Sequence, residues 1–519
     1  MINLNNREPI FPFVDPDNLD PDDPSLEPDE QDYVRQLLKS PKLQEDQRAI
    51  RDMLSTLQAN ILKGHDRDHA VLIFLHFNTM DRKSRKLKGK IVTALKKMIR
   101  TKSVKVTSAL TQLEEMRRYR RHKIPGGTVT NLYLTAAGYR ALGFKDNQLP
   151  NDRCFRAGIN ASANRLNDPE TWKLEEPYRQ DVDQDHIHAM ILMTDDDVQY
   201  LGRQVRLILN EMLKTPSGLE LARVVTIEHG HQLRDAELQP IEHFGFRDGL
   251  SNPLFLNTDR KQVGKYGGDS RWRPWAPLNL ILTPEPSARK TPGYGSFLVY
   301  RKLEQNVPFF NDQIRNLGLS LSKGRDEPTT LERARALVVG RFSEGTPLTL
   351  EKMPYLSQYN SQPNYNNFTY DDDPTGAKCP FHAHIRKANP RNDDSRDRRI
   401  VRRGITYGER NLERERQGLQ APPAKDVGLL FMCFQADIAL QFEFIQSSLN
   451  NPDLPEKKSG IDPISGQTPG RQSLSDLAWP RTWGNSGDIY KDIFNSCVSL
   501  KGGEYFFAPS ISFLKNIAS

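Results

Sequence analysis

Short apolar runs separated by polar turns mark the strands that the sequence predicts. Runs of four to nine apolar or β-branched residues, bounded by Gly, Pro, Asn or Asp, are typical of buried strands. They predict strands at 69–77, 128–134, 186–193, 223–230, 295–303 and 427–435, and the segment 504–514 is expected to form a last strand and the tail of the chain. The lengths of these runs favour a sheet protein rather than a helical bundle.

Between these runs, apolar residues recur at spacings of three and four, which predicts amphipathic helices. The segment after the first strand carries Leu87, Ile91, Leu95 and Met98 or Ile99 at this spacing. In 194–213, Thr194 is expected to cap the helix, with Asp197 three residues on as in a capping box. Further helices are expected at 46–64, 309–319, 331–337 and 437–449.

The order of these elements predicts an α+β fold of tandem ferredoxin-like units. A β-α-β succession occurs twice before residue 240, which indicates a four-stranded antiparallel sheet with peripheral helices. A similar order returns after that point. We therefore divide the chain into an acidic, proline-rich arm (1–45), an N-terminal ferredoxin-like domain (46–240) and a C-terminal one (241–519). The arm is expected to be extended, because its composition offers little apolar surface to bury.

Charge changes this picture little. The chain has 73 Lys+Arg against 66 Asp+Glu, a net charge of +7 over 519 residues. That excess does not by itself argue for nucleic acid. Lys and Arg concentrate in 82–123, and two interpretations of this segment stay open: a solvated face paired in part with the acidic arm, which we favour, and a nucleic-acid surface.

The cysteines and the apolar segments bear on the cellular setting. Four cysteines lie far apart and form no Cys-x-x-Cys pair, which favours a reducing compartment over a disulfide framework or a metal cluster. The N-terminus does not resemble a secretory leader, and no apolar run is long enough to span a bilayer. We therefore expect a cytoplasmic protein with no membrane partner.

The stretch Glu242–Pro253, EHFGFRDGLSNP, concentrates candidate chemistry. Gly245 and Gly249 frame a single acid, Asp248, beside Arg247 and between aromatic residues. Glycines at this density indicate tight backbone geometry, and an acid held among aromatics is a candidate for proton transfer. Composition alone favours a plain turn between two elements.

Two further stretches carry histidines and arginines. In Cys379–Arg391, CPFHAHIRKANPR, His382 and His384 lie two residues apart and would share a face if the segment were extended. In Arg398–Gly408, RRIVRRGITYG, Arg402 and Arg403 lie in a β-type run. A histidine of this kind is a candidate metal ligand, and an arginine can bind an anion or polarise a bound oxygen.

Taken together, these three stretches resemble the dye-decolorising haem peroxidases, in the longer-chain branch of that family. Gly245–Gly249 matches the family's GxxDG motif, and the histidine and arginine stretches follow in the family's order and spacing. The flanks at 58–72, 295–307 and 502–514 agree as well. The resemblance covers roughly residues 55–519 and implies two ferredoxin-like halves, with the haem pocket mainly in the C-terminal half.

The resemblance also implies roles for residues around the haem. His384 matches the ligand of the haem iron, and His382, at a position that the family leaves variable, ranks second. Asp437 resembles the acid that hydrogen-bonds the ligand histidine, and Arg386 is expected to contact a propionate.

On the opposite, peroxide-binding side, Asp248 matches the distal acid and Arg402 the distal arginine. Gly245, Phe246, Arg247 and Gly249 are expected to form the wall over the haem.

The activity that the resemblance implies is a peroxidase with one haem b per chain. It would use hydrogen peroxide to oxidise bulky organic molecules, such as anthraquinone dyes and phenolics, in one-electron steps through a ferryl intermediate. The expected partners are peroxide and small aromatic reductants, without nucleic acid. A haem-handling protein with incidental peroxidase activity is the alternative, and both a monomer and a homo-oligomer stay open.

Overall fold

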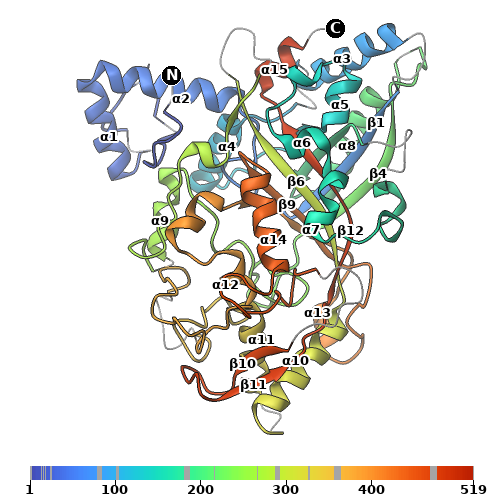
Figure 1. Cartoon of the computed structure of the whole chain (residues 1–519). Coiled ribbons are helices and arrows are strands. Elements are labelled where there is room, and N and C mark those ends of the chain that lie inside the picture. The colour runs from blue at the N-terminus through green and yellow to red at the C-terminus, as the bar shows by residue number, and fades with distance from the viewer. Residues whose placement is uncertain are drawn as a thin grey trace.

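Two sets of four strands join into one closed antiparallel sheet in the computed structural model (Figure 1). The structure describes residues 3–517 apart from 13, 16, 18, 24–25, 79–83, 101–104, 180–186, 216, 266, 287–292, 325–327, 356–363 and 468–475. The first set runs β2-β3-β1-β4 and the second β12-β6-β9-β8. Both sets have the strand order of a ferredoxin-like unit, so the predicted α+β fold is confirmed.

The strands have the following bounds. The first set comprises β1 (His69–Phe77), β2 (Val129–Leu134), β3 (Ala189–Asp195) and β4 (Ala222–His231). The second comprises β6 (Tyr294–Gln305), β8 (Ile405–Tyr407), β9 (Gly428–Gln435) and β12 (Val498–Ala508). Short strands β5 (Thr283–Pro284) and β7 (Val401–Arg402) pair with β6 and β9, and β10 (Leu477–Pro480) pairs with β11 (Ile489–Asp492).

The two units meet at both of their edges, which closes the sheet. Leu134 of β2 pairs with Phe507 of β12, and Gly230 of β4 pairs with Tyr407 of β8. Within the second unit, β6 pairs with both β12 and β9. Both edge strands of each set thus pair, over part of their length, with a strand of the other set, which limits their pairing with other chains.

Alternation along the strands creates one core inside the closed sheet and another outside it. Leu72, Phe74 and Leu298 are fully buried in the interior cluster, whereas Ile73 and Val299 pack outward against helices. The period of two in side-chain direction therefore divides each strand between the two cores.

Helices surround the sheet, and some of them pack on its outer face. The helices of the first half are α1 (Pro28–Lys39), α2 (Pro41–Thr56), α3 (Ser84–Arg100), α4 (Ala109–His122), α5 (Ala136–Ala141), α6 (Arg153–Ala157), α7 (Ala163–Leu166) and α8 (Val198–Leu213). Those of the second half are α9 (Arg260–Lys265), α10 (Val307–Leu321), α11 (Pro328–Val339), α12 (His384–Ala388), α13 (Leu412–Arg416), α14 (Phe444–Asn450) and α15 (Ile511–Asn516). No helix in the described parts of the chain is long and apolar enough to span a bilayer.

The predicted helix at 194–213 forms, but with a different cap. The Asp197 carboxylate accepts the N–H groups of Gln199 and Tyr200 at the start of α8. Thr194 is instead a buried residue of β3. The cap therefore lies where the chain leaves the strand. Of the predicted strand at 186–193, residue 186 lies outside the described residues.

The N-terminal arm folds further than expected. Residues 28–39 form α1, and Val34 and Leu37 pack against Val14 in a small apolar cluster. The expectation of an extended arm is wrong for this part, because two apolar residues one turn apart suffice to seat a short helix. The predicted end of the arm at residue 45 falls inside α2.

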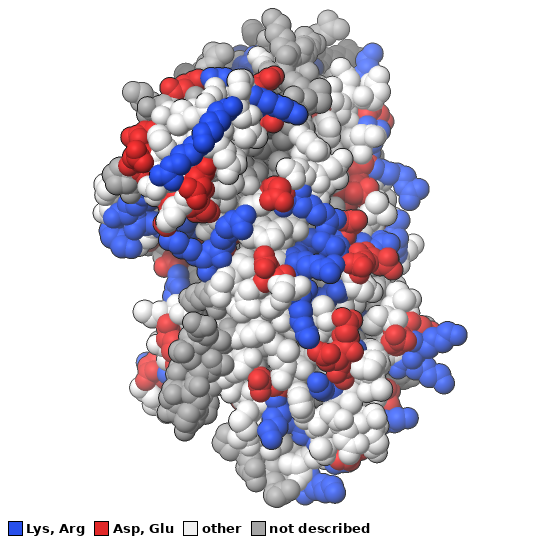
Figure 2. Space-filling view, turned by 90° about the vertical axis from the view of Figure 1, so that its left-hand side faces the viewer, with Lys and Arg blue, Asp and Glu red and all other residues white. Residues whose placement is uncertain are grey.

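Acidic residues of the arm meet basic residues elsewhere. Glu27 pairs with Lys261 of α9 at 2.7 Å, and Asp23 and Glu30 interact with Arg117 of α4. Figure 2 shows that Lys and Arg are interspersed with Asp and Glu over the face that carries the N-terminal helices. Charges of both signs are therefore mixed over this face.

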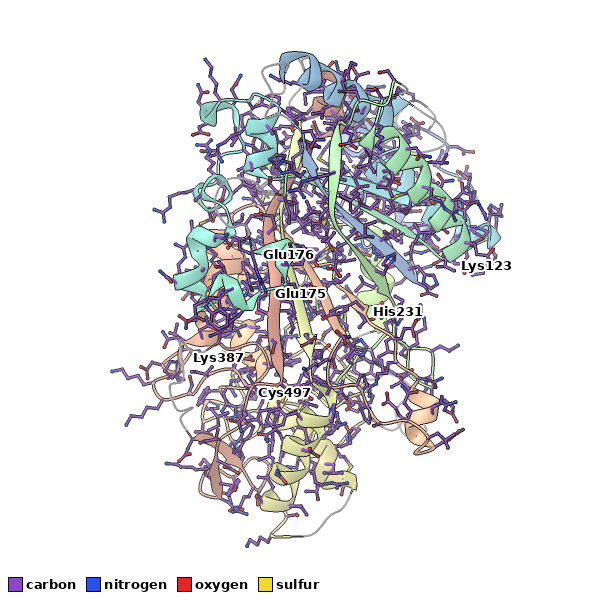
Figure 3. All side chains as sticks on the ribbon, turned by 90° about the vertical axis from the view of Figure 1, so that its right-hand side faces the viewer. Lys123, Glu175, Glu176, His231, Lys387 and Cys497 are labelled. Atoms are coloured by element: carbon purple, nitrogen blue, oxygen red, sulfur yellow. The ribbon has the colours of Figure 1, made fainter. Side chains whose placement is uncertain are left out.

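The connection between β2 and β3 reaches across to the second unit. Figure 3 shows Glu175 and Glu176 lying against the strands of the C-terminal half, and the Glu175 N–H donates to the Lys501 carbonyl of β12 (2.8 Å). The Glu175 carboxylate also accepts from Lys302 of β6 at 2.7 Å. A segment of the first unit thus packs on strands of the second.

Candidate functional site

A cavity of about 1560 Å³ lies between the outer face of β6 and β9 and the segments around α12 and α14. The three stretches singled out in the sequence all contribute to its lining. Its volume exceeds the 300–1,000 Å³ or so of a typical small-molecule site, so it accommodates a large cofactor or several small molecules.

The loop that presents Asp248 is held by the carboxylate of Glu242, a half-buried residue that also lines the cavity. Glu242 accepts the N–H groups of Phe244 (2.9 Å) and Phe246 (3.0 Å). Burial raises the pKa of Glu242, its hydrogen bonds lower it, and the nearby Asp248 raises it, so that the pKa lies above its ordinary value. Gly245 has a φ of 91°, a conformation that favours glycine. These contacts turn the loop so that Asp248 lines the cavity.

Asp248 and Arg402 come together across 154 residues of sequence. Arg402 Nη1 donates to Asp248 Oδ1 at 3.2 Å, and both side chains are about one-third exposed. Arg402 is further fixed by Asn252, whose amide oxygen accepts the Arg402 N–H (3.0 Å) and whose amide nitrogen donates to the Arg402 carbonyl (3.4 Å). Sequence reasoning missed the role of Asn252, although it lies within the GxxDG stretch.

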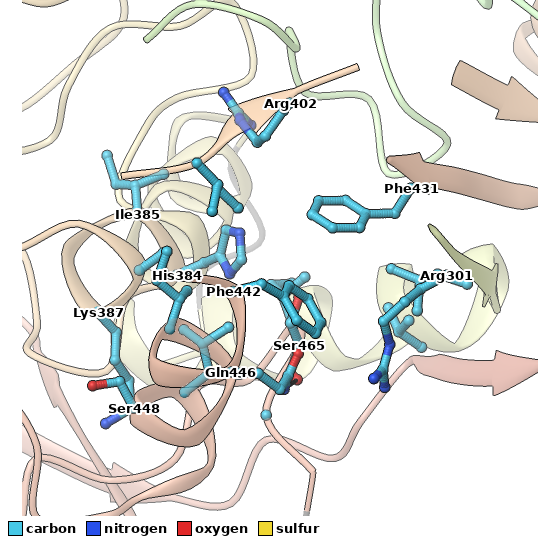
Figure 4. A pocket seen from close by; sticks show the side chains of 18 of the residues that line it. Arg301, His384, Ile385, Lys387, Arg402, Phe431, Phe442, Gln446, Ser448 and Ser465 are labelled. Carbon is cyan, nitrogen blue, oxygen red and sulfur yellow. Dashed lines mark hydrogen bonds between the residues drawn. The ribbon is translucent and has the colours of Figure 1, made fainter. Parts of the chain in front are cut away.

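His384 enters the cavity from a different element. It is the first residue of α12, and Figure 4 shows its ring in the open space that Arg402 and Phe431 border. Its Nδ1 lies 2.8 Å from Asp462 Oδ2, and Asp462 is fully buried. Burial lowers the pKa of His384, but Asp462 raises it by more, so that it lies above its ordinary value. The Nδ1–H···carboxylate bond leaves Nε2 as the nitrogen with a free lone pair.

The structure corrects the predicted partner of His384. Asp437 does not contact the histidine; its carboxylate accepts the Leu440 N–H at 2.8 Å. Asp462 takes that place because the N–H groups of Ile464 and Ser465 fix its carboxylate (2.7 and 2.6 Å). The sequence feature that could have pointed to Asp462 is its position in a short Pro- and Gly-containing loop, DPISG (462–466).

Arg386 is also placed differently from the prediction. Its guanidinium is buried and donates to Asp373 Oδ2 at 2.7 Å, and its planar group lies over the rings of Tyr370 and Phe381. It is not among the residues that line the cavity. A propionate contact is therefore not supported, because the charge of Arg386 is already balanced within the protein core.

The remaining predicted wall residues divide into two groups. Phe246, Arg247 and Gly249 line the cavity, whereas Gly245 does not and serves the turn instead. His382 is buried against Trp479, with ring centroids 4.4 Å apart, and does not line the cavity. The extended arrangement that would have placed His382 and His384 on one face does not occur, because the chain turns into α12 between them.

The donor set around His384 fits a haem. Among the described residues, no three His, Cys, Asp or Glu side chains gather into a metal site. The cavity has the room for a macrocycle, which would supply the other ligands of an iron bound at His384. Histidines that bind a metal ordinarily donate their other ring N–H to a carboxylate or carbonyl, as Nδ1 of His384 does to Asp462.

Known proteins agree with this geometry. Residues 56–222 match the family model described as DyP dimeric alpha+beta barrel domain, and residues 323–459 match Dyp-type peroxidase, C-terminal. The multifunctional dye peroxidase DyP2 of Amycolatopsis sp. is 38% identical over 485 residues, which cover 90% of this chain and 96% of that protein.

Solved structures show the same relationship. A DyP-type peroxidase of Anabaena sp. (AnaPX) superposes with a TM-score of 0.79 at 37% identity, covering 91% of this chain and 96% of that one. The structure of DyP2 from Amycolatopsis superposes with a TM-score of 0.77 at 36% identity, covering 89% and 96%. The chain belongs to the family of DyP-type peroxidases.

Proposed function

We propose that this chain is a haem-dependent peroxidase that uses hydrogen peroxide to oxidise bulky organic substrates, such as anthraquinone-type dyes and phenolics. One observation carries the proposal. A carboxylate-backed histidine and an acid–arginine pair, from segments far apart in sequence, line the same large cavity. Family membership makes peroxide and aromatic reductants the expected partners.

The cofactor that we propose is haem b, one per chain. His384 would bind the iron through Nε2, and Asp462 would fix the ring orientation and increase the basicity of the ligand. Phe246 and Gly249, which line the cavity, would face the haem macrocycle. Bound haem supplies a redox-active iron at which a peroxide oxygen binds.

The distal residues would handle the proton and the charge of the peroxide. Asp248 would take the proton from one peroxide oxygen and return it to the other, departing oxygen, acting as general base and then general acid. Arg402 keeps its positive charge throughout and stabilises the negative charge that develops on these oxygens. Asn252 holds the Arg402 backbone, and Glu242 holds the loop of Asp248, so both groups are positioned before peroxide arrives.

The double variant Asp248→Asn with Arg402→Leu tests this assignment. We expect the variant to retain haem with an unchanged absorption band, because neither residue hydrogen-bonds His384. The rate of peroxide reduction should fall roughly 10²–10⁴-fold. Stopped-flow absorption with anthraquinone dye turnover measures both. An unchanged rate would support the haem-handling alternative, which no observation on the described residues favours.

We further propose a reducing, cytoplasmic setting. The four cysteines, Cys154, Cys379, Cys433 and Cys497, are all buried and unpaired, as expected where thiols stay reduced. The division into units 46–240 and 241–519 is likewise a proposal. It is supported by the strand orders, since β1–β4 fall in the first unit and β6–β12 in the second.

A further inference from the structure

A cluster of polar side chains lies behind the cavity wall, around Glu443. The chain forms a π-helical turn at Ala439–Glu443, so Phe442 lines the cavity while the next residue, Glu443, is buried away from it. Glu443 accepts a hydrogen bond from Tyr505 Oη at 2.9 Å and another from Cys154 Sγ at 3.2 Å, and it pairs with Arg165. π-Helical turns of this kind are frequent at functional sites. The peroxide chemistry described above uses none of these four polar groups.

Tyr505 lies one side-chain layer from the cavity. It is fully buried on β12, and its ring centroid is 6.4 Å from that of Phe442. Arg301 also lines the cavity, and the central carbon of its guanidinium lies 5.7 Å from the centroid of the Phe442 ring. Figure 4 shows Phe442 and Arg301 side by side on the wall that faces His384. An electron passing between Tyr505 and the cavity would thus cross a single aromatic contact.

In this cluster the phenol and the thiol carry protons and the Glu443 carboxylate does not, so the carboxylate can accept a proton. Burial raises the pKa of Glu443, but its hydrogen bonds and Arg165 lower it by more, so that it lies below its ordinary value. Burial raises the pKa of Cys154 to about 12 and that of Tyr505 well above its ordinary value. The phenol and the thiol therefore keep their protons, and Glu443 is an ionised acceptor held against the phenolic hydrogen.

Two features distinguish Tyr505 from other buried tyrosines: its hydroxyl donates to a carboxylate, and its ring lies directly behind the cavity wall. The hydroxyls of Tyr133, Tyr139 and Tyr370 have no hydrogen-bond partner among the described residues. Tyr178 does donate to a carboxylate, that of Glu228, but it belongs to the cluster inside the closed sheet and does not line or back the cavity wall. Of these residues, Tyr505 combines a bonded proton acceptor with a position directly behind the cavity.

We propose that Tyr505 is an internal electron donor to the haem site and that Glu443 receives its proton. The proposal rests on the proposed function, because the oxidant is the haem centre after its reaction with peroxide. Tyr505 gives up one electron, and its O–H bond breaks as the proton moves along the existing hydrogen bond to Glu443. The products are a neutral tyrosyl radical and a neutral carboxylic acid.

The step reverses when an aromatic reductant supplies an electron. Tyr505 takes that electron together with the proton that Glu443 holds, which restores the phenol and the carboxylate. Because the proton moves to Glu443 as the electron leaves, the phenol does not become a cationic radical in the protein core. The cluster would store one oxidising equivalent reversibly while no reductant occupies the cavity.

Electron paramagnetic resonance of the haem-loaded protein, frozen shortly after mixing with hydrogen peroxide, tests the proposal. We expect an organic radical whose hyperfine structure narrows when the protein contains ring-deuterated tyrosine. Tyr505→Phe should lose this signal. Tyr139→Phe is the matched control, since Tyr139 is equally buried in the same outer cluster but bonds no carboxylate, and it should keep the signal.

Glu443→Gln provides a second variant if Tyr505→Phe fails to bind haem. The amide can accept the phenolic hydrogen bond but cannot take the proton, so the tyrosyl signal should again be lost. A tyrosyl signal that persists unchanged in Tyr505→Phe or in Glu443→Gln overturns the proposal, as does a signal insensitive to deuteration. If wild-type protein binds haem but does not consume peroxide, the proposed function itself fails; this result is distinguishable from peroxide consumption without a radical at Tyr505.

Discussion

At the scale of single residues, the pairing of His384 with Asp462 fixes the orientation of the proposed haem ligand. The sequence analysis assigned this role to Asp437, but the fold places Asp462 at His384 instead. Asp462 is buried and fixed by backbone N–H groups, so its charge interacts more strongly with the imidazole than it would in water.

We predict that Asp462→Asn weakens haem retention or peroxidase activity about 10–100-fold, the range typical for changing a residue that hydrogen-bonds a metal-binding histidine. The amide can still accept the Nδ1–H but carries no charge, so the ligand becomes less basic and the reduction potential of the iron rises. Haem titration and spectroelectrochemistry measure these effects. Asp437→Asn is the control, because an amide can still accept the Leu440 N–H. Equal effects of the two substitutions would contradict the assignment.

A buried glutamate gives a prediction about pH. Glu285 follows β5 and accepts hydrogen bonds from the backbone and side chain of Ser510, the cap of α15. Burial raises its pKa from 4.5 to about 8, and the bonds from Ser510 only partly oppose this. Between these two pH values the folded protein binds a proton that the unfolded chain has lost, so the free energy of unfolding falls as pH rises through this window.

Glu285→Gln removes this titration. Relative to the variant, wild type should lose stability between pH 4.5 and about 8, with a slope of at most about 1.4 kcal/mol per pH unit. Above this window the difference should level off, because both states of wild type are then ionised. Urea unfolding of the two proteins at several pH values measures the difference. A constant difference across this range would show that Glu285 is ionised throughout.

At the scale of elements, the GxxDG loop depends on the conformation of Gly245. A Cβ at this position would meet nothing within 4 Å, so the cost of Gly245→Ala comes from its φ of 91° alone. We predict a loss of about 1–2 kcal/mol in the free energy of unfolding, together with reduced peroxide turnover as the loop shifts Asp248.

Gly202 supplies the matched comparison. It lies inside α8 with helical backbone geometry, and a Cβ at this position would also meet nothing within 4 Å. Gly202→Ala should therefore raise stability by about 0.5–1 kcal/mol and leave turnover unchanged. Chemical denaturation and steady-state kinetics on both variants separate the two effects. A destabilised Gly202→Ala, or a neutral Gly245→Ala, would contradict this account.

The elements themselves were largely predictable, because strong periodic patterns specify them. The apolar run at 69–77 coincides with β1, and Ile91, Leu95 and Met98 are buried on α3 as their spacing predicts. The helix expected at 437–449 instead begins with a π-helical turn, since the insertion of a residue is invisible to a pattern of apolar positions. The Asp248–Arg402 pair and Asp462 depend on contacts between distant segments, and local patterns do not encode those distances.

At the scale of the whole molecule, the closed sheet makes the two ferredoxin-like units depend on each other. Edge strands β2 and β4 of the first unit pair with β12 and β8 of the second. The interior cluster draws on both, with Leu72 and Phe74 from the first unit and Leu298 and Phe434 from the second. A unit expressed alone would expose both its edges and its half of this core to solvent.

We therefore predict that 46–240 and 241–519 do not fold as separate soluble monomers. Expressed singly, each should aggregate or pair with itself through the exposed edges; co-expressed, they should associate, and the pair should bind haem at His384. Size-exclusion chromatography and the haem absorption band of the co-purified fragments measure this outcome. Because the cavity is lined mainly by the second unit, a soluble, monomeric 241–519 that binds haem by itself would show that the closed sheet is not needed to form the site. We expect instead that the second unit alone does not form the site. The outer faces of β6 and β12 lie behind the cavity, and their inner faces stay buried only when the first unit supplies its half of the interior core.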